Sequence, residues 1–356
     1  MQIDAGKLDD PLHRRATAAQ RAGNATAKIV PEERAWRTAV VRFIAIFCIL
    51  LAGFFAAIVA IDPYDSGRLP SLIGPGVPDD DPRTANVSRG RDPTFNAGIF
   101  GNSRAMLLDP SRLVQLTGFQ FVQLTVPSSG AREEAAMLRY FVRLHDNVDA
   151  VIMMLDPRWC GRDPEVPPQA PFPFELYGGN LQYFASLLNT RAAAIAYTRV
   201  LMGFGKLPAF ERSGYFDFES DPRWVFQPTA PERASVDLVP APLAKPPFPA
   251  LDHMEKALSE LAPSTAVVLF WPPFYYTELP EAGSEQAREI PGCKYELTQR
   301  AALHRNWRIA DYLLDSPVSR DPSNFLDGGH FRQPIAKQIE YQIAAMFADI
   351  RQPGHF

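Results

Sequence analysis

Two segments far apart in the chain carry side chains that can catalyse acyl transfer. Ser103 lies in the segment Gly-Asn-Ser-Arg, and His330 closes Asp-Gly-Gly-His near the C-terminus. A serine hydroxyl becomes a nucleophile when a neighbouring base takes its proton, and histidine is the usual base because its pKa lies near working pH. A carboxylate on the other ring nitrogen fixes the tautomer, and Asp327, three residues earlier, is placed to do this. We therefore expect Ser103, His330 and Asp327 to form a catalytic site; taken singly, each segment could also be an ordinary polar turn.

Gly130 follows Pro-Ser-Ser just before a predicted helix. A glycine there leaves a backbone N–H open to a ligand, next to a helix N-terminus that favours anions. We expect the N–H groups of Ser103 and Gly130 to bind the oxyanion of a tetrahedral intermediate. The alternative is a plain loop glycine.

Alternating strand and helix patterns must position these residues. Short apolar runs predict buried strands, and amphipathic stretches between them predict helices. This alternation predicts an α/β domain with a mainly parallel sheet, in which the loops after the strands meet at one edge. The expected strands are 97–100, 119–126, 150–155 and 265–271, and the expected helices are 110–117, 131–145, 180–202, 243–261, 295–314 and one beginning at Pro334.

Residues 43–61 are an uninterrupted apolar run without charge or proline. As a helix the run is about 28 Å long, which matches the core of a bilayer. Arg34, Arg37 and Arg42 precede it and a series of aspartates follows it, so the positive-inside rule places the N-terminus in the cytoplasm and the C-terminal domain in the periplasm. We expect a single-pass anchor in the inner membrane; a cleaved signal peptide would have a shorter apolar region and a shorter basic start.

The predicted organisation follows from these segments. We expect a cytoplasmic tail, a transmembrane helix, an extended connection and one α/β domain with a proline-rich, aromatic insertion. The tail covers 1–42, the transmembrane helix 43–61, the connection 62–94 and the α/β domain 95–350, and the insertion in that domain covers 157–247.

The composition argues against several functions. The formal net charge is −4, with 36 Lys and Arg against 40 Asp and Glu, so we expect no nucleic-acid partner. Three cysteines are too few for a disulfide scaffold or a structural zinc cluster. We find no phosphate-binding loop, dinucleotide fingerprint or metal-ligand motif, so we expect no cofactor and no metal. Cys48 lies inside the apolar run, whereas Cys160 and Cys293 either form a disulfide or remain buried free thiols.

The combination of motifs resembles the SGNH (GDSL-like) hydrolase superfamily. In that family the nucleophilic serine follows the first strand, and an Asp-x-x-His pair precedes the last helix; Ser103, Asp327 and His330 occupy these places. Residues 97–104 look like the first family block and Gly130 like the second. The resemblance implies a three-layer sandwich with a flavodoxin-like sheet and an esterase or acyl-transfer activity.

The chain is also similar to the D-alanyl-lipoteichoic acid biosynthesis and alginate O-acetylation protein families. The first of these has an N-terminal membrane helix, a Gly-Ser-Ser block, a Pro-x-Trp and a closing Asp-x-x-His; this chain has Gly101-Asn102-Ser103 and Pro157-Arg158-Trp159 in the corresponding places. This resemblance implies action on a cell-surface polysaccharide beside a membrane-bound O-acyltransferase or polysaccharide export proteins.

Asp156 departs from the family pattern. The third family block usually supplies an Asn that donates to the oxyanion, but an ionised Asp accepts hydrogen bonds only. Either Asn102 or backbone N–H groups complete the oxyanion hole, or the domain has lost catalysis. In the latter case the protein is a degenerate module that binds a polymer or scaffolds an envelope assembly.

Other side chains are expected near the same edge of the sheet. Arg104 could bind a substrate carboxylate or phosphate, or pair with an acid of the sheet edge. Trp159 and Trp271, with Phe274, Tyr275 and Tyr276, could pack on sugar rings or form core under the insertion. The insertion 157–247 could also dock a membrane partner.

Overall fold

The computed structural model describes residues 31–78, 81–208, 210–217, 219 and 243–352. The chain divides into two compact units, Met1–Ala56 and Ala57–Phe356. Much of the insertion, 220–242, lies outside the described residues, as does most of the expected cytoplasmic tail.

Helix α2 (Pro31–Ile61) contains the apolar run. Its segment Glu33–Ile61 is long and apolar enough to cross a membrane. The helix begins earlier than the expected boundary at 43, with Pro31 in its first turn, where proline costs no hydrogen bond.

The domain contains a five-stranded parallel sheet in the order β2-β1-β3-β4-β5. This is the order of flavodoxin-like doubly wound sheets. Apart from the edge strand β5, every strand is buried along its whole length, as the apolar runs predict. The strands are β1 (Ala97–Gly101), β2 (Phe121–Thr125), β3 (Ala150–Met154), β4 (Ala266–Trp271) and β5 (Trp307–Asp311).

The predicted helix at 295–314 is wrong in its second half. Helix α10 (Gln286–Ala301) starts earlier and ends earlier, and the chain then forms β5. Pro291 inside α10 argues against a helix at that point, and β5 lacks a continuous apolar run because it is only partly buried.

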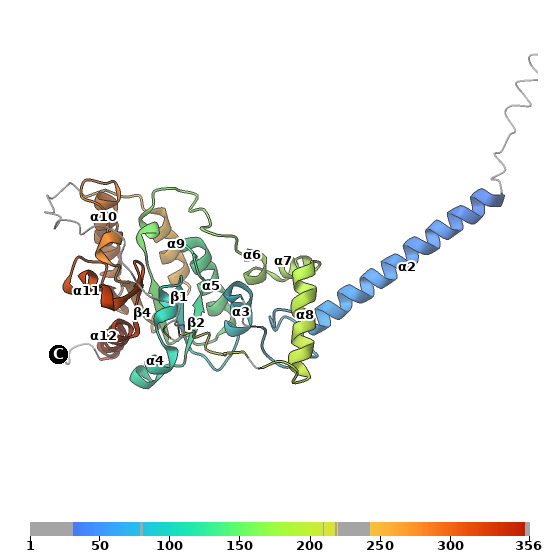
Figure 1. Ribbon diagram of the computed structural model, residues 1–356, viewed down its shortest axis with the longest axis horizontal. Coiled ribbons are helices and arrows are strands. Elements are labelled where there is room, and N and C mark those ends of the chain that lie inside the picture. Colours follow the sequence, from blue (N-terminus) through green and yellow to red (C-terminus); the bar gives the residue numbers. More distant parts are fainter. Residues whose placement is uncertain (1–30, 79–80, 209, 218, 220–242, 353–356) are drawn as a thin grey trace, which may run out of the picture. The chain divides into compact units, whose positions relative to one another are not determined.

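Different helices pack on the two faces of the sheet (Figure 1). Helices α4 (Pro110–Thr117) and α12 (Gln333–Arg351) contribute to the apolar cluster on one face. One face of α12 is apolar and buried; its members are Ile335, Ile339, Ile343 and Phe347. On the other face α5 (Ala131–Leu144) packs against α9 (Pro249–Leu258), and the rings of Phe100 and Phe141 meet edge to face with centroids 5.9 Å apart.

The expected extended connection at 62–94 contains a buried helix, α3 (Pro82–Arg89), packed against β2. Its sequence is polar because its side chains are satisfied inside the protein: Asn86, for example, donates to the carbonyl oxygen of Thr125 at 2.9 Å. A helix of this kind has no hydrophobic stripe to reveal it.

Short elements complete the domain. Helices α6 (Phe174–Tyr177), α7 (Asn180–Ala185) and α8 (Thr190–Gly203) form the described part of the insertion, where a single helix at 180–202 is predicted. The remaining elements are η1 (Ala105–Leu107), η2 (Pro157–Cys160), η4 (Tyr276–Glu278), α11 (Pro317–Arg320), η5 (Pro322–Asn324) and the antiparallel pair β6 (Phe325–Asp327) and β7 (His330–Phe331).

Candidate functional site

Ser103 follows β1 at the carboxyl edge of the sheet. The turn begins at Gly101, whose φ of +151° is a conformation that residues with a side chain rarely adopt. A Cβ at Gly101 would also lie 2.7 Å from the Cβ atoms of Ala105 and Met154. Glycine therefore allows the chain to leave the sheet sharply and to place Ser103 above its edge.

The β6–β7 pair brings Asp327 and His330 to the same place. One carboxylate oxygen of Asp327 accepts the backbone N–H groups of Gly329 at 2.7 Å and His330 at 2.8 Å. Both carboxylate oxygens lie 2.8 Å from Nδ1 of His330. Nε2 of His330 lies 2.8 Å from Oγ of Ser103, which is hydrogen-bond distance for a nucleophile and its base. With Nδ1–H donating to Asp327, Nε2 is left to accept the serine proton.

Asp327 is held in its ionised form. Partial burial raises the pKa of this carboxyl, but the hydrogen bond and charge of His330 and the backbone N–H groups of Gly329 and His330 outweigh it. The net result is a pKa below the usual value for aspartate. An anionic Asp327 fixes the imidazole ring and stabilises the imidazolium formed when His330 accepts a proton.

Asp156 is buried and surrounded by donors. Its Oδ2 accepts Nδ2 of Asn102 at 2.7 Å and the guanidinium of Arg158 at 2.7 and 3.0 Å, and lies 3.4 Å from Nη1 of Arg104. Its Oδ1 accepts the backbone N–H of Arg158 at 2.9 Å. Two guanidinium groups, those of Arg104 and Arg158, therefore balance the negative charge of Asp156.

The same contacts orient Asn102. Its side-chain oxygen accepts the backbone N–H of Arg104 at 3.1 Å, while its amide donates one hydrogen to Asp156. An amide carries two hydrogens, so the second can donate to a bound group. The structure thus holds the Asn102 amide at the end of β1, one residue from the serine.

Arg104 pairs with the sheet-edge acid, which is one of its two expected roles. Besides the contact with Asp156, its Nε donates to the carbonyl oxygen of Gly329 at 3.0 Å. Its guanidinium also lies 4.2 Å from the ring centre of Phe274. These contacts connect the serine turn directly to the turn that carries the histidine.

Gly130 does not offer an open N–H. Its backbone N–H donates to the carboxylate of Glu133 at 3.3 Å, forming a capping interaction at the start of α5. A Cβ at Gly130 would lie 2.5 Å from Cγ of Gln169, so close packing explains the glycine. The expected oxyanion role of Gly130 is therefore not supported by the geometry.

Trp159 and Trp271 are completely buried, each with 0% of its surface exposed. Burial excludes the expected contact with a sugar ring and makes both residues core. Phe274 and Tyr275 are also buried, and Tyr276 is partly buried with the guanidinium of Arg320 5.1 Å from its ring centre.

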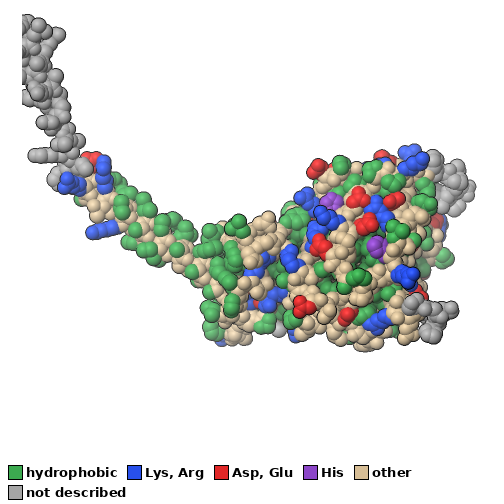
Figure 2. All heavy atoms as spheres, turned by 180° about the vertical axis from the view of Figure 1, so that it is seen from behind, with side chains coloured by type: hydrophobic (Ala, Val, Ile, Leu, Met, Phe, Trp, Pro, Cys, Tyr) green, Lys and Arg blue, Asp and Glu red, His purple; other side chains and the backbone are tan. Residues whose placement is uncertain are grey.

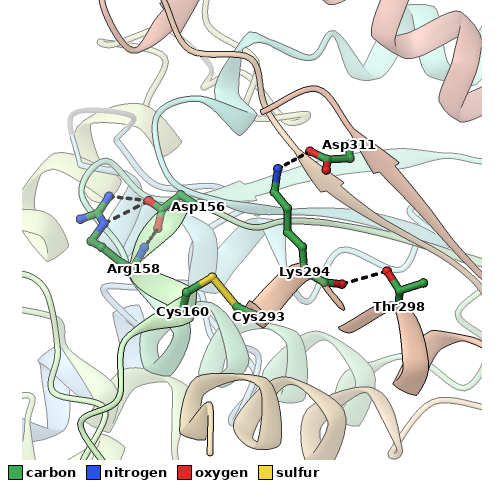
Figure 3. The surroundings of a disulfide bond; sticks show 7 residues. All are labelled: Asp156, Arg158, Cys160, Cys293, Lys294, Thr298 and Asp311. Atoms are coloured by element: carbon green, nitrogen blue, oxygen red, sulfur yellow. Dashed lines mark hydrogen bonds and ion pairs between the residues drawn. A yellow bond between two sulfur atoms is a disulfide. The ribbon is translucent and has the colours of Figure 1, made fainter. Parts of the chain in front are cut away.

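Cys160 and Cys293 form a disulfide with a Cα–Cα distance of 5.4 Å, which settles the alternative left open by the sequence. Figure 3 shows that this bond joins the segment after β3, which carries Asp156 and Arg158, to α10. On the same helix Lys294 binds Asp311 at the end of β5, at 2.8 Å. Two strand ends are therefore fixed to α10.

Glu133 and Glu134 lie in the first turn of α5, where acidic residues are common, but both are buried. Burial, with the nearby charge of Asp156, raises the pKa of Glu134 well above its usual value. Oε1 of Glu134 lies 2.9 Å from Oγ of Ser129. A neutral Glu134 spares the site a second buried negative charge. Only the packed structure reveals this, because acids in a first turn are common in helices.

The described residues contain no group of three or more His, Cys, Asp or Glu side chains placed to hold a metal ion. Ser103, His330 and Asp327 have the arrangement of a nucleophile, a base and an orienting acid, which can activate a serine for acyl transfer.

The chain matches none of the protein-family models and none of the curated proteins with which it was compared. Among solved structures it is similar to a gut microbial diltiazem-metabolizing enzyme, with 12% sequence identity and a TM-score of 0.34. The match covers 73% of this chain, which spans about half (49%) of that enzyme's length. A likeness this weak says nothing about the activity of the chain.

Proposed function

We propose that this chain is a membrane-anchored, SGNH-like serine esterase or O-acyltransferase of the cell envelope. In this proposal α2 crosses the inner membrane and the domain, a three-layer sandwich of flavodoxin-like type, acts in the periplasm on a surface polysaccharide. The observation that carries the proposal is the 2.8 Å contact between Ser103 and His330, with Asp327 on the other ring nitrogen.

In the proposed reaction Oγ of Ser103 attacks an ester carbonyl carbon while Nε2 of His330 takes the serine proton. The tetrahedral intermediate then expels the leaving alcohol, whose oxygen receives the proton from His330, and an acyl-serine remains. His330 next deprotonates water or an acceptor hydroxyl, whose oxygen bonds to the acyl carbon. The bond from that carbon to Oγ of Ser103 then breaks, Oγ takes the proton back from His330, and the acyl group leaves as the free acid or as a new ester. Asp327 stays ionised throughout and stabilises the imidazolium.

The oxyanion requires donors that are fixed before the reaction. We assign this role to the Asn102 amide and the Ser103 backbone N–H. Asp156 acts as the acceptor that orients Asn102, with Arg104 and Arg158 balancing its charge. In this proposal Asp156 helps the site through Asn102 instead of opposing the oxyanion.

The membrane anchor supports the polymer part of the proposal. An enzyme held at the membrane meets acyl groups and polymers as membrane proteins deliver them, so a membrane-bound O-acyltransferase or an export protein is the expected partner.

The second candidate is a non-catalytic module that binds a polymer or scaffolds an assembly. The engaged N–H of Gly130 favours it, because that group is then lost as an oxyanion donor. Under this alternative Ser103, His330 and Asp327 keep their arrangement, but the protein does not catalyse a reaction.

A fluorophosphonate probe that labels activated serines tests the proposal on the full chain in detergent. We expect labelling of the wild type and of Ser323→Ala, an exposed serine shortly before β6, and none of Ser103→Ala or His330→Ala. Equal labelling of Ser103→Ala would exclude this nucleophile. No labelling of the wild type, together with measurable glycan binding, would favour the module.

A further inference from the structure

Helix α8 (Thr190–Gly203) buries a charged residue among its apolar ones and exposes aromatic side chains. A helix on a water-facing surface buries its apolar stripe and exposes its charges. In α8 the charged residue Arg199 is completely buried together with Ala192, Ile195 and Ala196, whereas Tyr197 is exposed and the helix ends at exposed Phe204. The helix has one other charge, on Arg191 in its first turn, which pairs with Asp81.

Arg199 is buried because it binds the end of α2. Its guanidinium donates to the carbonyl oxygens of Ile61 at 2.6 Å, Gly74 at 2.7 Å and Gly76 at 2.8 Å, and also to that of Asp62. The last carbonyls of a helix have no intrahelical donor and attract cations. Arg199 thereby fixes α8 beside the last residues of α2 (Figure 1).

A second exposed apolar segment lies at the same place. Leu72 has 80% of its surface exposed, yet its backbone N–H donates to the carbonyl oxygen of Ala60 in the last turn of α2, at 3.1 Å. Arg68, next to exposed Leu69, binds the side chain of Asn180, the residue before exposed Leu181. We call these exposed side chains the juxtamembrane face: Leu69, Leu72, Leu181, Tyr197 and Phe204. Figure 2 shows hydrophobic side chains gathered at this end of the domain.

We propose that the juxtamembrane face rests on the lipid bilayer, with α8 lying in the boundary between headgroups and acyl chains. The face is continuous with the end of the apolar helix α2, which makes lipid its nearest apolar surroundings. A helix with one apolar face and aromatic residues is suited to that boundary. The inference rests on the membrane anchor of the proposed function, but not on its catalysis.

The inference changes what the anchor does. Arg199 and Leu72 bind backbone carbonyl groups at the end of α2, those of Ile61 and Ala60. The bilayer contact of α8 would hold the domain at a fixed height above the membrane. The site would then meet acceptors and donors at the membrane surface.

Spin labelling of the full chain in vesicles of phosphatidylcholine and phosphatidylglycerol tests this proposal. Each variant carries Cys48→Ala, which removes the free thiol among the described residues, and one new cysteine. The test position is Tyr197→Cys, and the matched control is Tyr341→Cys on α12, because the two tyrosines are 66% and 63% exposed. Leu50→Cys inside α2 reports the bilayer itself.

We expect the nitroxide at 197 to collide more often with oxygen, which concentrates in lipid, than with a water-soluble nickel chelate. The nitroxide at 50 should behave in the same way, whereas the nitroxide at 341 should collide more often with the nickel chelate than with oxygen. Aqueous behaviour at 197 with lipid behaviour at 50 would overturn this proposal and leave the anchor intact, whereas aqueous behaviour at both would overturn the anchor as well. A label at 197 that is exposed to water in vesicles but shielded in native membranes would show a protein partner, which also contradicts the proposal.

Discussion

The substitution Asp156→Asn distinguishes two explanations for the aspartate that stands where the families that the sequence resembles have an asparagine. If Asp156 only stands where the families that the sequence resembles have an oxyanion donor, asparagine restores that donor and the activity rises. If Asp156 orients Asn102, as its contacts indicate, the substitution removes a charged acceptor from Asn102, Arg104 and Arg158 and the activity falls.

The expected size follows from the contacts. A hydrogen bond to a charged acceptor is worth about 1.5–3 kcal/mol, and loss of one oxyanion donor costs about 10²–10³ in rate. Releasing the Asn102 amide should therefore lower kcat/KM by about 10²-fold, or roughly 3 kcal/mol in transition-state stabilisation.

The assay is hydrolysis of a chromogenic ester by the full chain in detergent. The control is Asp311→Asn, which removes a carboxylate paired with Lys294 at the end of β5 and should leave kcat/KM near the wild-type value. Circular dichroism and the Tm check that both variants fold. An unchanged or raised kcat/KM in folded Asp156→Asn would refute the role assigned to Asp156.

Three further substitutions test other parts of the structure. Asp327→Asn leaves His330 without its anionic partner, and kcat should fall by about 10⁴-fold. Because the pKa of Asp327 is lowered in the folded state, the ionised carboxylate stabilises the fold above the unfolded pKa, and this stability is lost as pH falls through the folded pKa. The Tm of Asp327→Asn should therefore depend less on pH in the acid range than the wild-type Tm. Replacing Cys160 and Cys293 together with Ala opens a loop with a sequence separation of 133. The free energy of unfolding in urea should fall by about 2–5 kcal/mol, whereas Cys48→Ala should leave it unchanged. Glu134→Gln replaces a carboxyl whose pKa is raised in the folded state, mainly by burial. The wild type loses stability as pH rises from the unfolded pKa to the folded pKa of this carboxyl, because only the unfolded chain ionises there. The Tm of the variant minus the wild-type Tm should therefore increase with pH over that range. A Tm difference that is constant with pH would contradict the neutral state of Glu134.

The sequence by itself determined the features that are local. The apolar helix and the strands β1 to β4 follow from runs of apolar residues, because a buried parallel strand or a membrane-spanning helix needs such a run. The types and spacing of Ser103, Asp327 and His330 also predicted a nucleophile, an acid and a base. The resemblance to a known family predicted that they meet at one site, and the structure brings them to hydrogen-bond distance.

Tertiary structure alone decided which partner each polar or aromatic side chain has. Asp156 faces two guanidinium groups and Asn102, Glu134 is buried beside Ser129, and Trp271 is core. The same holds for α3 and β5, which are stabilised by neighbours distant in sequence and carry no clear pattern of their own. Charge and burial depend on groups that arrive from other parts of the chain, so a local pattern cannot specify them, whereas it does specify the strands and helices that bring those groups together.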